Sequence, residues 1–219
     1  MATLEIRTFT STGWGQNAYL ARAAGQVHAF AVDPGGATPQ MVEAIAREGI
    51  TLDAILLTHA HVDHIEGVAA LARATAAPVY LNPAERGWYE HSAAQASFFG
   101  VELEPPPPAD RELHGGDVLE LGGTTLEVRD VPGHAPGHVI LYDAAAGAAF
   151  VGDVVFQGSI GRTDLPGGSY RQLMEAIRSQ VLSLPDETVL YPGHGPPTTV
   201  GRERVGNPFL APMYGGGFA

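Results

Sequence analysis

Apolar and polar residues alternate over short stretches in the first half of the chain, as they do in half-buried β-strands. Between two of these stretches lies Gly25-Gln26, a pair typical of a hairpin turn. A helix is expected over residues 38–48, because Thr38 is a typical N-cap, a proline follows it, and Gly49 is a typical helix stop. The predicted strands cover residues 4–10, 17–24, 27–33, 52–58 and 78–81.

The second half of the chain repeats this order of strands, then a helix, then a strand. Gly122-Gly123 separates two alternating stretches and predicts another hairpin. Residues 169–184 carry a regular apolar stripe, and Ser169 with Gln172 fits a capping box, so a helix is expected there. The predicted strands cover residues 117–121, 124–131, 139–143, 148–152 and 188–191.

Two β-rich halves with outer helices predict an α/β fold, a four-layer αββα sandwich with functional sites at the shared edge of the two sheets. Four consecutive prolines, residues 105–108, form a stiff connector, so the halves are expected to meet near residues 105–110. No linker is visible. A single domain over residues 1–219 is therefore predicted.

Composition narrows the possible functions. The formal net charge of −12 disfavours binding to nucleic acid or to an anionic membrane surface. The chain has no cysteine, which removes disulfides, thiol nucleophiles and cysteine metal ligands from consideration. The N-terminal residues do not resemble a signal peptide, and no apolar run reaches the roughly 20 residues of a membrane span, so a cytoplasmic location is expected.

The most informative stretch is residues 58–67, THAHVDHIEG, between the predicted strand 52–58 and a helical run. Alternate side chains of an extended segment share a face, so His59 and His61 can reach one metal ion together. The chain then turns, and Asp63 and His64 point elsewhere. This strand-to-helix turn is where open α/β sheets place their sites, and its ligands suit two metal ions better than one.

Three further candidate ligands follow predicted strands. His134 lies in VPGHAPGH, Asp153 in FVGDVVF and His194 in YPGHGP, and each comes directly after a glycine. Glycine lets the backbone approach an ion closely, so these residues are expected at the rim of the sheets with the histidine cluster. His138 is expected to have a structural or supporting role, and Asp33 to form a turn.

Taken in order, T-H-A-H-V-D-H, P-G-H, G-D and P-G-H-G resemble the motifs of the metallo-β-lactamase superfamily. SIGRTDLPGGS and GRERVGNPFL are most similar to the short glyoxalase II-like hydrolases (hydroxyacylglutathione hydrolase-like proteins). The resemblance implies the αββα fold. It also implies that His59, His61 and His134 bind a first metal, that Asp63, His64 and His194 bind a second, and that Asp153 bridges both.

This ligand set predicts a metal-dependent hydrolase that uses two divalent ions, with zinc expected and iron or manganese compatible with nitrogen and oxygen ligands. Metal-bound hydroxide would attack a carbonyl, with Asp63 orienting it. The resemblance implies a small thioester substrate such as S-2-hydroxyacyl glutathione. It also gives Arg162 a glutathione-binding role, the alternative being a loop salt bridge with Asp164.

Two features depart from full-length glyoxalase II. The chain stops soon after Phe209, so the C-terminal helical glutathione-binding domain is expected to be absent, and Gly195-Pro196-Pro197 replaces a tyrosine. A persulfide dioxygenase with a single iron is the main alternative, because that family shares the G-R-T-D motif of residues 161–164. A lactonase or β-lactamase is a further alternative, although a bridging Asp153 disfavours the usual zinc β-lactamases.

Overall fold

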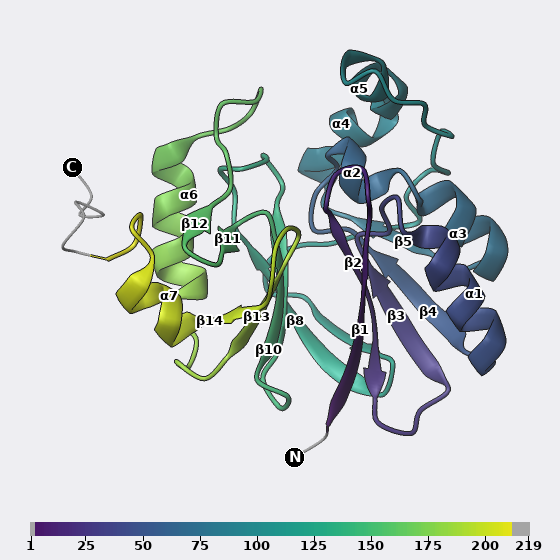
Figure 1. Ribbon diagram of the computed structural model, residues 1–219, viewed down its shortest axis with the longest axis horizontal. Coiled ribbons are helices and arrows are strands. Elements are labelled where there is room, and N and C mark those ends of the chain that lie inside the picture. The colour runs from purple at the N-terminus through teal and green to yellow at the C-terminus, as the bar shows by residue number, and fades with distance from the viewer. Residues whose placement is uncertain (1–2, 212–219) are drawn as a thin grey trace.

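The computed structural model describes residues 3–211, which form two six-stranded β-sheets facing each other, with helices on their outer faces (Figure 1). Large apolar side chains from both sheets meet between them; the ring of Phe150 lies 5.4 Å from that of Tyr19 and 5.8 Å from that of Phe30. Burial of this apolar surface is the main force that holds the sheets together.

The first sheet has the order β1-β2-β3-β4-β5-β6. Its first three strands are antiparallel, and β3 to β6 run parallel, so the carboxyl ends of β3, β4 and β5 share one edge. The strands are β1 (Leu4–Thr10), β2 (Asn17–Ala23), β3 (His28–Val32), β4 (Thr51–Leu56), β5 (Val79–Leu81) and β6 (Arg111–Glu112).

The second sheet has the order β14-β13-β10-β9-β8-β7, and β10 and β13 are parallel. The chain enters it after β6, a little beyond the expected meeting point near residues 105–110. The strands are β7 (Val118–Leu121), β8 (Thr124–Asp130), β9 (Val139–Asp143), β10 (Ala148–Gly152), β13 (Val189–Pro192) and β14 (Thr198–Thr199). A small separate hairpin joins β11 (Val155–Phe156) to β12 (Ser159–Ile160).

Helices cover the outer face of each sheet, which confirms the predicted αββα sandwich (Figure 1). On the first sheet, α1 (Thr38–Glu48) and α3 (Val68–Thr75) bury Met41, Ile45 and Leu71. The remaining helices of the first half are α2 (Val62–Ile65), the 3-10 turn η1 (Pro83–Glu85), α4 (Arg86–Glu90) and α5 (Ser92–Phe98). The second sheet is covered by α6 (Tyr170–Ala176), the π-helix η2 (Ile177–Val181) and α7 (Val200–Gly206).

Two local predictions were wrong in detail, and one helix was missed. The N-cap of α1 is Ala37, and the hydroxyl of Thr38 instead donates a hydrogen bond to the Gly35 carbonyl at 2.7 Å. The helix expected over residues 169–184 ends in the wider π-helical turn η2, although Ser169 caps its start as predicted. Helix α7 was not predicted, because the Gly-rich and charged stretch around it shows no apolar stripe.

Among residues 3–211, no helix is long and apolar enough to cross a membrane.

Candidate metal centre

His59 and His61 lie on the loop that joins the carboxyl end of β4 to α2. Both side chains are buried, and their rings meet edge to face with centroids 4.6 Å apart. The Nε2 atoms of both rings are buried and make no hydrogen bond with any described residue. A buried nitrogen without a partner is costly in a folded protein, unless it serves a ligand.

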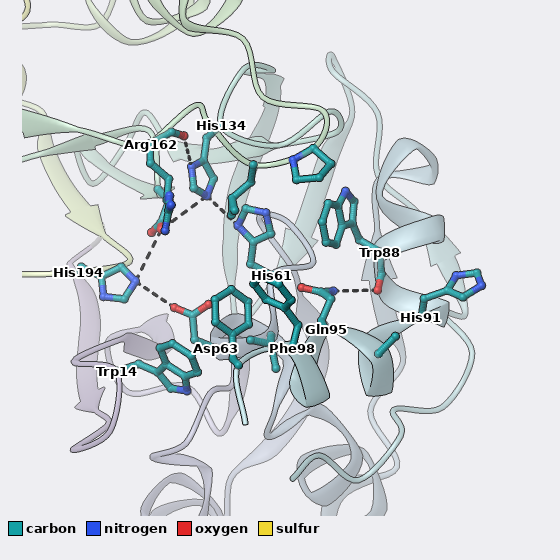
Figure 2. A pocket seen from close by; sticks show the side chains of 16 residues that line it. Trp14, His61, Asp63, Trp88, His91, Gln95, Phe98, His134, Arg162 and His194 are labelled. Carbon is teal, nitrogen blue, oxygen red and sulfur yellow. Dashed lines mark hydrogen bonds and ion pairs between the residues drawn. The ribbon is translucent and has the colours of Figure 1, made fainter. Parts of the chain in front are cut away.

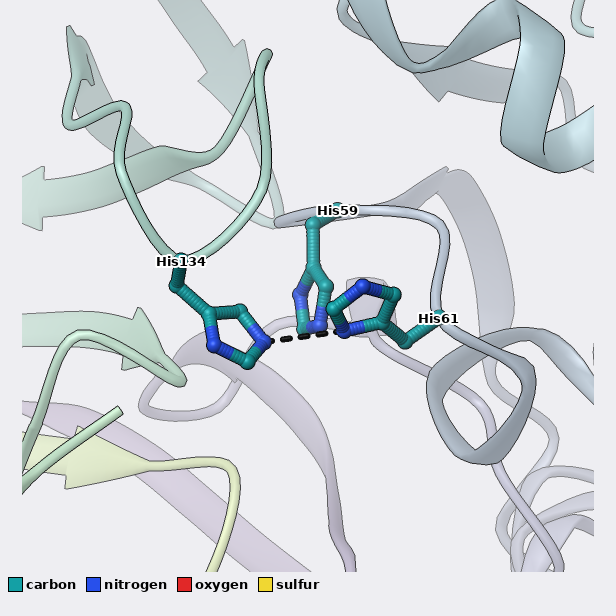
Figure 3. Close-up of side chains that lie close together, drawn as sticks. All are labelled: His59, His61 and His134. Atoms are coloured by element: carbon teal, nitrogen blue, oxygen red, sulfur yellow. Dashed lines mark hydrogen bonds between the residues drawn. The ribbon is translucent and has the colours of Figure 1, made fainter. Parts of the chain in front are cut away.

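His134 reaches the same point from the loop after β8 (Figure 3). Its Nδ1 donates a hydrogen bond to the Arg162 carbonyl at 2.8 Å, which orients the ring and directs Nε2 toward Nδ1 of His61, 2.9 Å away. One ring nitrogen from each of His59, His61 and His134 lies within 4.8 Å of the others. We call these three residues the first group.

A second group consists of Asp63, His64 and His194, whose ligand atoms also lie within 4.8 Å of one another. Asp63 and His64 come from α2, while His194 follows β13 in the other sheet. Nε2 of His194 lies 3.1 Å from Oδ2 of Asp63.

Contacts from the first sheet hold the His194 loop in place. The Tyr19 hydroxyl donates to the Pro192 carbonyl at 2.6 Å, and Nδ2 of Asn17 donates to the Gly195 carbonyl at 2.8 Å. Both donors belong to β2, so the second group is assembled across the two sheets.

Asp153 lies between the two groups, at the end of β10. Its Oδ2 is 3.6 Å from Nε2 of His134 and 3.6 Å from Nε2 of His194, and its Oδ1 is 3.3 Å from Nε2 of His64. Oδ1 nevertheless makes no hydrogen bond of acceptable geometry with the described residues. Its position is that of a carboxylate facing both groups.

The first group is held in the neutral form. Burial lowers the pKa of His59 far below its ordinary value, with further lowering by the neighbouring histidines. Burial, followed by His134, lowers the pKa of His61 to about 3, and burial also lowers the pKa of His134. Neutral imidazoles keep the lone pair that a metal ion requires.

In the second group, nearby carboxylates raise the pKa values of the histidines. Burial opposes the charge on His64, but Asp153, Asp63 and Asp33 outweigh it and raise the pKa of this histidine well above normal. Burial also opposes the charge on His194, and contacts with Asp63 and Asp153 again raise its pKa. Against the effect of burial, His64 lowers the pKa values of both Asp63 and Asp153. Here carboxylates and histidines neutralise each other.

Asp33 supports the centre from behind. Its backbone has a φ of 49°, and its side chain is buried and accepts hydrogen bonds from the Thr58 amide, the Thr58 hydroxyl and Nδ1 of His64 at 2.7, 2.7 and 2.9 Å. We expected Asp33 to form a turn, but its side chain instead bonds the loop after β4 and orients His64. His138 is buried, accepts a hydrogen bond from the Asp153 amide at 3.1 Å and stacks on His59.

Glu85 ties together the two loops that carry the first group. It is fully buried at the end of η1; Oε2 accepts a hydrogen bond from the Ala60 amide at 2.9 Å, and Oε1 accepts one from the Gly137 amide at 2.7 Å. Gln95 of α5 reaches the same loop and donates to the Ala60 carbonyl at 2.9 Å. These contacts fix the spacing between His61 and His134.

Glycine is required where the backbone meets the ligands. A Cβ atom at Gly193 would clash with Oδ1 of Asp153 and lie 2.6 Å from Cε1 of His64. A Cβ at Gly152, whose φ is +46°, would lie 2.6 Å from Nε2 of His138. Gly152 and Gly193 thus make room for the side chains that converge on the centre.

Both groups open into a cavity of about 500 Å³ (Figure 2). Besides candidate ligands, its lining is mostly apolar and includes Trp14, Trp88, Phe98 and Leu165. Arg162 also lines it, but its guanidinium makes a two-pronged ion pair with Asp164, with distances of 2.7 and 2.8 Å.

These residues fit divalent metal ions. Nε2 of His59, His61 and His64 and Oδ1 of Asp153 are buried without hydrogen-bond partners, and nitrogen and oxygen donors suit zinc, iron or manganese. The seven residues singled out from the sequence all meet at this centre. Divalent ions held by these donors beside the cavity would polarise a carbonyl and activate water.

Sequence reasoning missed Glu85 and the supporting role of Asp33. The role of Asp33 could have been found, since a polar residue directly after a buried strand can lie at the same sheet edge as the histidines. Glu85 lies in an ordinary helix start, PAERG, and shows no pattern that separates it from a surface residue.

Comparison with known proteins agrees with this geometry. Residues 11–194 match the family model described as the metallo-beta-lactamase superfamily. A relative from Bacillus subtilis, "Probable metallo-hydrolase YqgX", is 40% identical over 89% of this chain and 92% of its own length. A second, "Hydroxyacylglutathione hydrolase GloC" from Haemophilus influenzae, is 36% identical over 84% of this chain and 87% of its own.

Solved structures are similar over nearly the whole chain. The "BLEG-1 B3 metallo-beta-lactamase" has a TM-score of 0.88 and 39% identity, covering 94% of this chain and 99% of that one. "TTHA1623 in a di-iron-bound form" has a TM-score of 0.86 and 40% identity, covering 93% of this chain and all of that one.

Proposed function

This chain belongs to the metallo-beta-lactamase superfamily, and from that premise we propose that it is a metal-dependent hydrolase that cleaves a small thioester of the S-2-hydroxyacyl glutathione type. The observation that carries the proposal is that residues of both ligand groups line one cavity, and that buried nitrogens of these groups lack hydrogen-bond partners among the described residues. The relative named as a hydroxyacylglutathione hydrolase supports the thioester.

Two divalent ions are proposed. His59, His61 and His134 would hold the first, Asp63, His64 and His194 the second, and Asp153 would face both. When bound, such ions polarise a carbonyl and lower the pKa of water to near neutrality. Zinc is the proposed ion; the relative solved in a di-iron form makes iron the next to test.

Asp63 is the proposed catalytic residue. It lines the cavity and is partly exposed there, with 14% of its side chain accessible, whereas His64 beside it is fully buried. A carboxylate in this position can accept a hydrogen bond from the attacking water and hold one of its lone pairs toward the substrate carbonyl. His194, 3.1 Å from Asp63, keeps that carboxylate in place.

The leaving group follows from what lines the cavity. Apart from the candidate ligands, the titratable side chains among the described lining residues are His91 and Arg162. In Figure 2, His91 lies beyond Trp88, away from the ligands, and an arginine does not give up its proton. A thiolate needs little or no protonation as it leaves, so a thioester suits this cavity better than an amide.

Arg162 is proposed to contact a carboxylate of the thiol half, such as one of glutathione. Asp164 already occupies its guanidinium fork, so a substrate carboxylate must compete with this neighbour. Arg162→Ala should lower kcat/KM for the glutathione thioester roughly 10–150-fold, and Asp164→Asn should raise it. Equal rates in all three proteins would show that Arg162 does not bind a substrate carboxylate, while the proposed reaction would stand.

The test is a metal count combined with a substrate panel. Elemental analysis after loading with zinc, iron or manganese should give two ions per chain, and one ion or fewer under every condition would refute the two-ion centre. The panel is a glutathione thioester, glutathione persulfide with oxygen uptake, a lactone and a β-lactam, the last prompted by the similar B3 enzyme. Oxygen consumption without thioester cleavage would identify a dioxygenase instead.

A further inference from the structure

An aromatic wall stands over one side of the candidate metal centre. Trp14 comes from the loop between β1 and β2, and Phe98 and Phe99 come from the end of α5. The Trp14 and Phe99 rings meet edge to face at 5.5 Å, and those of Phe99 and Phe98 at 5.1 Å. We call these three residues the aromatic wall.

Two side chains of the aromatic wall are exposed to solvent, although both are phenylalanines. Phe98 is 82% exposed and Phe99 40% exposed, yet both line the cavity that opens onto the ligands. Exposed aromatic side chains that gather at a pocket are typical of surfaces that receive an apolar ligand.

Trp88 extends this apolar lining to the ligands themselves. It packs edge to face on His61, with ring centroids 5.6 Å apart. An apolar surface therefore runs from the first group to the mouth of the cavity.

The arginine of the described lining lies on the opposite side. Arg162 belongs to the loop after β12 in the second half, whereas the aromatic wall and Trp88 belong to the first half (Figures 1 and 2). A substrate that spans the ligands thus has a charged contact at one end and aromatic rings at the other.

The aromatic side offers little to a polar group. Its polar side chains are largely engaged: both hydrogen bonds donated by Gln95 go to backbone carbonyls, of Ala60 and Trp88, and Nδ1 of His91 bonds the Gly87 carbonyl. A polar acyl group placed there would lose water without gaining equivalent hydrogen bonds, whereas an apolar group would gain burial.

We propose that the acyl half of the substrate carries a bulky apolar group, aryl or branched alkyl, that packs between the aromatic wall and Trp88. This rests on the proposed thioester hydrolysis, with the thiol half directed toward Arg162. It assigns substrate selection to Trp14 and Phe98, residues outside the ligand set.

The first test varies the acyl group on one thiol. Glutathione thioesters of lactic acid, 2-hydroxy-4-methylpentanoic acid and 2-hydroxy-2-phenylacetic acid share a leaving group and differ in apolar bulk. The structure predicts that kcat/KM rises at least about 10-fold from the lactoyl to the bulky thioesters, since one well-packed group can give that factor. Equal rates or a preference for lactoyl would overturn the inference.

Variants of the aromatic wall test whether these residues cause the preference for a bulky acyl group. Trp14→Ala and Phe98→Ala should each reduce the ratio of phenyl to lactoyl kcat/KM roughly 3–10-fold. Val205→Ala removes an apolar side chain that is 74% exposed on α7, away from the cavity, and should leave the ratio unchanged. A ratio unaffected by both aromatic variants would refute the assignment.

Binding provides a readout that is independent of turnover. The chain has two tryptophans, and both line this cavity, so intrinsic fluorescence reports its occupancy. In the metal-loaded protein, 2-hydroxy-2-phenylacetate should change the emission at a concentration at least about 10-fold lower than lactate does. Equal response to both acids would contradict an apolar subsite.

The two proposals fail in different ways. If no thioester is cleaved, the proposed reaction is wrong, whereas the acid titration still tests the apolar cavity. If thioesters are cleaved without regard to acyl bulk, the reaction stands and the inference about the aromatic wall falls.

Discussion

Asp33 accepts a hydrogen bond of 2.9 Å from Nδ1 of His64, although Asp33 lies on the loop after β3 and His64 on helix α2. This contact engages one nitrogen of the ring and leaves Nε2 pointing toward Asp63 and Asp153. A carboxylate behind a ligating histidine fixes the ring orientation and raises its basicity.

Asp33→Asn should therefore weaken the second metal more than the first. Loss of such a supporting carboxylate typically costs about 10–100-fold in metal affinity. Competition with a chromogenic chelator would measure both binding steps, with Asp53→Asn, a partly exposed aspartate near the opposite ends of the strands, as the control. Unchanged affinity for the second ion would show that Asp33 does not support metal binding through His64.

Glu85→Gln should destabilise the fold. The buried carboxylate accepts hydrogen bonds from the amides of Ala60 and Gly137, but a glutamine side chain can offer its oxygen to one and must turn its NH₂ toward the other. An unsatisfied buried donor costs about 1–3 kcal/mol in the free energy of unfolding. Urea denaturation would measure it, and the exposed neighbour Glu90→Gln should show no comparable loss.

Gly193→Ala should disrupt the metal centre while sparing the rest of the fold. The added methyl group would occupy the space of Oδ1 of Asp153 and Cε1 of His64, so both side chains would have to move. We expect the second site to hold less than one tightly bound ion per chain, and turnover to fall strongly. Gly206→Ala, where a methyl group meets no atom within 4 Å, is the matched control. Full metal content in Gly193→Ala would argue against this packing.

Asp63→Ala should reduce hydrolysis more than it reduces metal content. Asp63 is proposed both to bind the second ion and to orient water, and loss of a group that handles a proton typically costs about 10²–10⁴-fold in rate. Turnover should be measured per metal-loaded chain, with occupancy determined in the same sample. A fully loaded variant with near-normal kcat would assign Asp63 to metal binding alone.

Removing the ions should lower the stability of the folded chain. The proposed ligands come from both halves of the chain and meet only in the folded protein. Bound ions therefore stabilise the folded state and not the unfolded state. At a free concentration about 100 times its Kd, each ion contributes about 2.7 kcal/mol to the free energy of unfolding. Thermal unfolding with and without chelator would show the difference. A Tm unaffected by chelator would contradict tight binding at this centre.

The sequence was informative where one local pattern decides the outcome. The histidine cluster lies on a strand-to-helix turn, and the glycine before His134, Asp153 and His194 marks a tight approach of the backbone; all of them meet in the structure. The αββα sandwich followed from strands and helices whose apolar periodicity is clear.

What could not be predicted depends on distant contacts. Glu85 is buried only because two loops, separated from it by 25 and 52 residues, direct their amides at it. Trp14 lies in a short turn and gains its place at the cavity through the end of α5. The π-helical turn at Ile177–Val181 has no sequence signal, because the apolar stripe that predicts a regular helix is itself buried in the core as expected.

The division of the ligands between the two sheets has a consequence for protein synthesis. Asp63 and His194 are 131 residues apart, so a ribosome adding about 5–20 residues per second needs roughly 7–26 s to pass from one to the other. During that time the second group lacks His194, whereas the first group is complete in sequence once His134 has been added. Tyr19 and Asn17 hold the late His194 loop against the first sheet, so the second group can be completed only after most of the chain has been made.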